Sequence, residues 1–177
     1  NHSFLFHPQA VVGEIQTNPV RQDLEEVGKI MGVDFAVNVV LDETNRLLKA
    51  FCGDPLEVEK VGSEFCRSVY EISVSREYDV VVASPGGYPK DLNLYQAQKG
   101  LAHATPIVRK GGYIVLLAEC PDGHGEEVFY ETMKRFSSPA EIVEKFPTEP
   151  FKMGAHKAFL WARSLVKAEV HLCSVME

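Results

Sequence analysis

Apolar residues recur along the chain with two spacings, and each spacing predicts one kind of element. Where they stand three or four positions apart, an amphipathic helix is expected. The segment 18–32 shows this spacing and has matching end signals, with Asn18 as a cap, Pro19 in the first turn and Gly32 after the last turn. Helical spacing also occurs in later segments: 55–73, about 91–103, 125–136, 138–146 and 154–168.

Strands are expected where apolar residues alternate or form short unbroken runs. The segment 33–54 predicts a hairpin with the turn DETN, because apolar residues two positions apart share one face of its first strand. These residues are Phe35, Val37, Val39 and Leu41. The runs YDVVVAS (78–84) and GGYIVLLAEC (111–120) contain few polar residues, so we expect parallel strands that are buried on both faces. EVHLCSV (169–175) predicts a final strand.

Strands that alternate with helices predict an α/β fold. We expect a Rossmann-like, mainly parallel sheet with right-handed connections and helices on both faces, plus an N-terminal hairpin. Residues 1–17 show no period, and we expect them to be an extended entry segment. Residues 18–177 then form one α/β domain, with more of a parent sequence after it.

The composition is typical of a globular protein. Of 177 residues, 45% are hydrophobic and 24% are charged, which allows one domain with a sizeable core. The net charge of -7 argues against binding to nucleic acid or to an anionic membrane surface. No apolar run approaches the roughly 20 residues of a membrane span. The four cysteines form no CxxC pair, so we expect buried, reduced thiols of a cytoplasmic protein rather than zinc or iron–sulfur ligands.

The stretch SPGGYPKDLNLYQAQKG (84–100) follows the first apolar run, in the position where open α/β sheets bind ligands. Its two glycines would let a ligand approach the backbone, and the N-terminus of the following helix favours anions. On that helix Tyr95, Gln96 and Lys99 share one face. A phenol, an amide and a cation together suit a small hydroxy acid. The alternative is a solvated helix face behind an ordinary turn.

Other candidates stand near the same predicted edge of the sheet. At the second glycine-rich turn, Glu119, Cys120 and His124 could form a nucleophile–base set, with a capped turn as the alternative. His156 and Lys157 begin the last helix, where they face either the crevice or solvent. We expect His171, in an apolar strand, to be a satisfied core histidine.

Together these motifs resemble the C-terminal domain of the nickel-dependent lactate racemase family. The resemblance rests on SPGGYPKDLNLYQAQKG, GGYIVLLAEC and GHGEEVF, and it extends to NPVRQDLEEVGKIMGVDFAVNVVLDE and GAHKAFLWARSL. It implies a two-domain racemase or epimerase of 2-hydroxy acids with a covalent nickel-pincer nucleotide. In this family, hydride passes from the substrate carbon to the cofactor, and it returns to either face of a 2-keto acid.

The family's Tyr-Gln-x-x-Lys element falls on Tyr95, Gln96 and Lys99. The resemblance implies that all three residues bind and orient the substrate. It also implies that Gln96 and Lys99 take part in catalysis. Residues 18–177 would then be the substrate-facing domain of the parent enzyme.

The resemblance also implies a split active site. The sequence Asn1–His2 looks like the family's Asn-His pair, which makes His2 a nickel ligand, and we assign His156 to cofactor binding. The tethering lysine and the acid–base histidines belong to the absent N-terminal domain of the parent chain. We therefore expect the fragment alone to bind no cofactor and to racemise nothing. The rival hypothesis is a non-catalytic α/β module that binds a small anion or a nucleotide through Ser84–Lys90.

Overall fold

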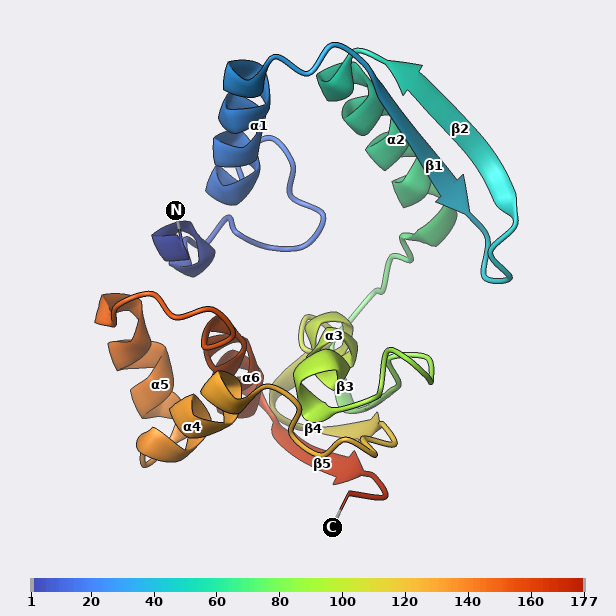
Figure 1. Ribbon diagram of the computed structural model, residues 1–177. Coiled ribbons are helices and arrows are strands. Elements are labelled where there is room, and N and C mark those ends of the chain that lie inside the picture. The colour runs from blue at the N-terminus through green and yellow to red at the C-terminus, as the bar shows by residue number, and fades with distance from the viewer. Residues whose placement is uncertain (1, 177) are drawn as a thin grey trace. The chain divides into compact units, whose positions relative to one another are not determined.

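The computed structural model describes residues 2–176, apart from the side chain of His2, and the chain divides into two compact units (Figure 1). The first unit is Asn1–Ser73 and the second is Val74–Glu177. This boundary follows the second long helix, whereas the sequence suggested one domain from residue 18 onward. The predicted nickel ligand, the side chain of His2, lies outside the described part of the chain, as does Asn1.

The first unit contains an antiparallel hairpin packed against a helix. Strands β1 (Ala36–Leu41) and β2 (Leu47–Gly53) pair, and α2 (Pro55–Tyr70) contacts both. They are preceded by η1 (His2–Phe6) and α1 (Pro19–Met31), so the first 17 residues contain a 3-10 helix in place of the expected extended segment. The small core of this unit is formed by Val40, Phe51 and Val58.

Local signals in the sequence fix the ends of these elements. Asn18 caps α1 by accepting a hydrogen bond from a first-turn amide, and Gly32 ends the helix in the left-handed conformation. In the hairpin turn, the Asp42 carboxylate accepts hydrogen bonds from Thr44 and Arg46. These hydrogen bonds lower the pKa of Asp42 to about 2.

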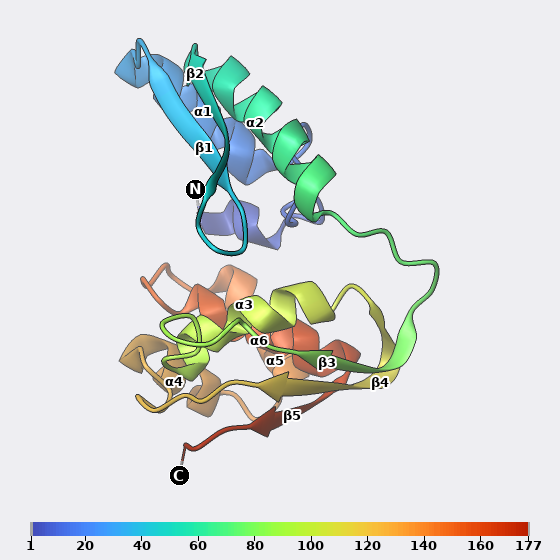
Figure 2. The ribbon, with the colours of Figure 1, turned by 90° about the vertical axis from the view of Figure 1, so that its right-hand side faces the viewer.

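The second unit is a three-stranded parallel sheet with helices packed against it (Figure 2). In chain order its elements are β3 (Tyr78–Ala83), α3 (Leu94–Ala104), β4 (Val108–Leu117), α4 (Glu127–Arg135), α5 (Pro139–Lys145), η2 (Phe146–Thr148), α6 (His156–Lys167) and β5 (Glu169–Cys173). The strand order is β3-β4-β5. The predicted α/β fold, with a parallel sheet and a separate hairpin, is thus confirmed, and β3 and β4 are parallel neighbours as expected.

The core of the second unit lies between the sheet and the helices α3 and α6. These two helices contact each other and the strands, and Figure 2 shows both along one face of the sheet. Right-handed connections place successive helices on the same face when the strand order advances in one direction. On that face Ile114 and Leu116 of β4 are fully buried, together with Leu101 of α3.

The opposite face of the sheet is exposed among the described residues, which corrects one expectation. Val80 and Val82 are 54% and 64% exposed, whereas Val81 between them is buried. The apolar runs therefore alternate like half-buried strands and are not buried on both faces. His171 is also exposed on β5 and not in the core, and its Nε2 lies 3.0 Å from Oε1 of Glu169.

The four cysteines do not share one environment. Cys120 is fully buried, whereas Cys52, Cys66 and Cys173 are exposed, and all four are free thiols. The expectation of buried thiols is therefore wrong for the three exposed ones. The physical reason is their position on a small hairpin unit and on the open face of the sheet, where few side chains are available to cover them.

Candidate functional site

Two loops meet at the carboxyl-terminal edge of the sheet. The first loop, residues 84–93, follows β3, and the second loop, residues 118–126, follows β4. Backbone hydrogen bonds join them, written here with the amide donor first: Cys120 to Asp91 (2.8 Å), Asp122 to Leu92 (3.0 Å), Leu94 to Gly123 (3.0 Å) and Tyr95 to His124 (3.2 Å). The start of α3 is therefore held in place by the second loop.

These bonds occupy the amides at the start of α3. The N–H groups of Leu94 and Tyr95 donate to the second loop, and the N–H of Gln96 donates to the side chain of Asn93 at 3.0 Å. A helix N-terminus binds an anion through free N–H groups, and here those groups are already engaged. The expectation that this terminus would favour an anion is therefore wrong. Recognition of an anion at this edge depends on side chains instead.

The predicted side chains of α3 lie beside these loops. Lys99 is exposed, and its ammonium donates a hydrogen bond to the amide oxygen of Gln96 at 2.9 Å. Tyr95 is partly buried, and its ring makes edge contacts with Phe129 and His156 at centroid distances of 6.0 and 6.5 Å. The structure thus orients Lys99 through Gln96 and fixes the ring of Tyr95 by packing.

The first turn of α6 brings two more side chains to the same place. His156 contacts Tyr95, as described above, and the Lys157 ammonium lies 5.5 Å from the centroid of the Tyr95 ring. That ammonium also donates a hydrogen bond to Oε1 of Gln98 at 2.7 Å, and Gln98 is only 5% exposed. Helices α3 and α6 therefore build one cluster with two lysines, a histidine and a tyrosine.

The cluster is positively charged and partly shielded from water. Burial, followed by the charge of Lys99, lowers the pKa of Lys157. Burial, followed by the charge of Lys157, lowers the pKa of His156 against a smaller opposing effect of Glu126. The imidazole is therefore neutral near pH 7. Two cations that repel each other beside a neutral imidazole form a site that a bound anion would stabilise.

Sequence reasoning left the place of Lys157 open and assigned no role to Gln98. The available signal was a polar amide at position 98 among apolar neighbours on α3, since a buried amide needs a hydrogen-bond partner. The partner lies on another helix, far along the chain, and no pattern within α3 could identify it.

The second loop does not form a nucleophile–base pair. Cys120 is fully buried, and burial raises the pKa of its thiol, whereas a reactive cysteine needs a lowered pKa. The ring of His124 stacks on Tyr130 with centroids 4.1 Å apart, and its Nε2 lies 3.9 Å from Glu127. Within residues 2–176, no hydrogen bond joins Cys120 to His124. The hypothesis of a catalytic cysteine therefore loses its support.

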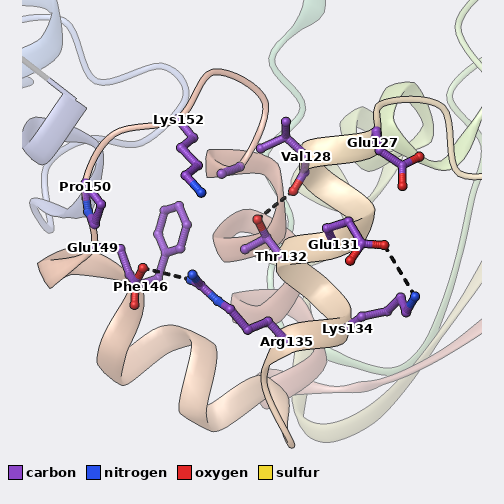
Figure 3. Close-up of a pocket in the computed structure, with 11 residues that line it drawn as sticks. Glu127, Val128, Glu131, Thr132, Lys134, Arg135, Phe146, Glu149, Pro150 and Lys152 are labelled. Atoms are coloured by element: carbon purple, nitrogen blue, oxygen red, sulfur yellow. Dashed lines mark hydrogen bonds and ion pairs between the residues drawn. The ribbon is translucent and has the colours of Figure 1, made fainter.

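A cavity of about 510 Å³ lies elsewhere in the second unit, between α4 and the segment 146–155 (Figure 3). Its charged side chains mostly pair with one another. Arg135 lies 2.9 Å from Glu149, and Lys134 lies 3.4 Å from Glu131. Paired charges leave little attraction for a ligand, so the cluster on α3 and α6 is the better candidate site.

Two features are absent from the part of the chain that the structure describes: a metal cluster and a membrane-spanning helix. Among residues 3–176, whose side chains are described, no three His, Cys, Asp or Glu side chains come together as a metal site would require. Over the same residues, no helix combines the length and the apolar character needed to cross a membrane.

Comparisons with known proteins agree with one another. Residues 74–176 match the family model described as the lactate racemase C-terminal domain. A lactate racemase of Thermoanaerobacterium thermosaccharolyticum is 34% identical over 147 residues, which is 82% of this chain and 34% of that protein. A lactate racemase of Lactiplantibacillus plantarum is 33% identical over 152 residues, which is 85% of this chain and 36% of that protein.

A solved structure has the same fold. The lactate racemase apoprotein from Thermoanaerobacterium thermosaccharolyticum matches with a TM-score of 0.88 at 32% identity, over 97% of this chain and 42% of that chain. The chain spans about a third of the length of the curated relatives that it matches.

Proposed function

Because the chain belongs to the lactate racemase family, we propose that its second unit orients the substrate in a racemase of small 2-hydroxy acids. The observation that carries this proposal is the arrangement of Tyr95, Gln96 and Lys99 on one helix beside the carboxyl-terminal edge of the sheet. These are the residues on which the family's Tyr-Gln-x-x-Lys element falls. A cation, an amide and a phenol at this edge match the carboxylate and hydroxyl of a 2-hydroxy acid.

Each of these side chains has a distinct task in the proposal. The Lys99 ammonium donates to the substrate carboxylate, and Gln96 holds that ammonium in position through the hydrogen bond of 2.9 Å. The phenol of Tyr95, whose ring is fixed by packing, binds a further substrate oxygen. Holding the reacting carbon in one place lowers the activation barrier through proximity and orientation.

Racemisation requires the C2–H bond of the acid to break and to form again on the opposite face. We propose that hydrogen leaves C2 as hydride while a base takes the hydroxyl proton, so that a 2-keto acid forms. Return of the hydride to either face, with return of the proton to oxygen, gives either enantiomer. Acceptance and return of the hydride is the chemistry that a nickel-pincer nucleotide, implied by the family resemblance, supplies when it is bound.

The described residues suit one side of such a cofactor pocket. His156 keeps its imidazole neutral near pH 7 and partly buried, so it can exchange hydrogen bonds with a cofactor without adding charge. His2 remains the proposed nickel ligand. In the proposal, the tethering lysine and the acid–base histidines lie in an N-terminal domain of the parent protein. Residues 1–177 alone should then bind no cofactor and racemise nothing.

The test uses the full-length parent protein, produced together with the enzymes that make the cofactor. Single enantiomers of 2-hydroxy acids of increasing size, beginning with lactate, are offered as substrates, and loss of optical purity is followed by chiral chromatography. We expect at least one acid to racemise. Racemisation of none of the acids would contradict the proposal.

A variant of Lys99 then tests the site. Lys99→Met should lower kcat/KM about tenfold to hundredfold, because a hydrogen bond to a charged group contributes about 1.5–3 kcal/mol. Lys110→Met is the matched control, since it removes an exposed cation at the opposite end of β4. The control should keep its activity. Full activity of Lys99→Met on every accepted acid would favour the solvated-face alternative.

A further inference from the structure

A second lysine stands beside the proposed substrate-binding face, and the family motif named above does not include it. We propose that Lys157 acts together with Lys99 as a pair of cations that binds one carboxylate group of a small carboxylic acid. The identity of the acid rests on the proposed function. The pair itself rests on the contacts of Lys157 with Gln98 and Tyr95.

Among residues 2–176, neither ammonium of the pair has a carboxylate within ion-pair distance. Lys99 donates to an amide oxygen of Gln96, and Lys157 donates to an amide oxygen of Gln98. An amide oxygen positions an ammonium without neutralising its charge. Another lysine of α6 shows the usual arrangement, because the Lys167 ammonium lies 2.8 Å from a carboxylate oxygen of Glu77.

Lys157 is partly buried, and no carboxylate of the described residues pairs with its ammonium, which points to an anionic ligand. Its ammonium is held between the ring of Tyr95 and the buried amide of Gln98, and the charge of Lys99 is close enough to repel it. Removing a charge from water without a counter-charge is unfavourable, and repulsion adds to that cost. An anion between the two ammonium groups would offset both the cost of burying the charge and the repulsion. The two ammonium groups are thus arranged for a negative ligand.

The surroundings favour a carboxylate over a phosphate. Phosphate sites in α/β folds commonly use free N–H groups at a helix N-terminus. At the start of α3, the amides of Leu94, Tyr95 and Gln96 are all engaged in hydrogen bonds. Two ammonium donors match the two oxygens of one carboxylate, one donor for each oxygen. Binding at two points also fixes the plane of the carboxylate, and with it the direction of the C1–C2 bond.

The test compares a charged ligand with an uncharged ligand of the same shape. Lactate and lactamide differ in the carboxylate, and their dissociation constants can be measured by calorimetry on the full-length protein without its cofactor. Lys157→Met keeps the aliphatic stem and removes the charge. We expect it to weaken lactate binding about tenfold to hundredfold, and to leave lactamide binding within about twofold. Lys134→Met, which removes an exposed cation of α4, is the control and should change neither.

The outcomes separate this inference from the proposed function. If Lys99→Met loses affinity for lactate and Lys157→Met does not, the pair is wrong and the proposed function stands. Equal weakening of lactate and lactamide in Lys157→Met would reveal a structural role and overturn the inference. Inorganic phosphate serves as a second probe. Phosphate binding tighter than lactate binding, lost in both lysine variants, would overturn the choice of a carboxylate. A wild-type protein that binds lactate in this way but racemises no 2-hydroxy acid would contradict the proposed function alone.

Discussion

Replacing Gly154 by alanine should destabilise the second unit by more than the cost of placing alanine in a left-handed backbone conformation. Gly154 is buried with φ +91° in the turn before α6, and an added Cβ would lie 2.6 Å from the carboxyl carbon of Glu126. A left-handed conformation costs a non-glycine residue about 1–2 kcal/mol. Glu126 must also move, and its carboxylate caps α4 by accepting a hydrogen bond from the Phe129 amide at 2.8 Å. Loss of such a cap costs about 0.5–2 kcal/mol.

Gly123→Ala is the matched control for this variant. Gly123 also has a positive φ, +62°, but no atom of a neighbouring group lies within 4 Å of an added Cβ. Hydrogen exchange of peptides that cover α4 and α6 reports the local unfolding free energy in the full-length protein. We expect Gly154→Ala to lose about 0.5–2 kcal/mol more than Gly123→Ala, which is the contribution of the displaced cap. Equal protection of the α4 amides from hydrogen exchange in the two variants would refute the argument that an added Cβ displaces Glu126.

Acid should weaken the hairpin of the first unit, because the pKa of Asp42 is lowered from 3.8 to about 2. The contribution of the Asp42 carboxylate to stability is complete above its pKa in the unfolded chain and is lost as pH falls from about 4 to about 2. Asp42→Asn should therefore remove this acid dependence, as followed by an NMR titration of the hairpin. In the native protein, iodoacetamide should alkylate the exposed Cys52 and leave the buried Cys120 unmodified, as measured by mass spectrometry. Rapid alkylation of Cys120 would support the hypothesis that it is a nucleophile. Asn93 caps α3, so Asn93→Ala should destabilise this helix by about 1 kcal/mol and lower kcat/KM, whereas Asn93→Asp should keep the cap. An unchanged melting temperature in Asn93→Ala would count against the capping role.

The sequence predicted the elements well where the signal was local. Asn18 and Gly32 mark the two ends of α1 as expected, and the apolar runs of β3 and β4 form neighbouring parallel strands. The exposure of Val80 and Val82 could not be predicted in the same way. Which face of a strand is covered depends on the order of all strands and on the side of each connection, and no short window of sequence contains that information.

The same distinction holds for the candidate site. The common face of Tyr95, Gln96 and Lys99 follows from helical geometry at 100° per residue, although their role in binding stays a prediction. The position of Lys157 depends on packing of α6 against α3, and the partners Lys157 and Gln98 are 59 positions apart in the sequence. The use of the α3 amides by the second loop is equally non-local. A motif could therefore suggest the chemistry of the site but not its charge balance.

The hydrogen bonds between the two loops at the sheet edge also determine how that edge can move. Neither the second loop nor the start of α3 can shift alone without breaking several backbone hydrogen bonds at once. Thermal motion should therefore concentrate in the stretch Ser84–Lys90, where Gly86 and Gly87 both have positive φ and Tyr88 is 79% exposed. If a ligand orders this stretch, the entropic penalty is limited to a few residues, at about 1–2 kcal/mol for each backbone unit fixed. The backbone of the second loop and of the start of α3 is already held by hydrogen bonds before any ligand arrives.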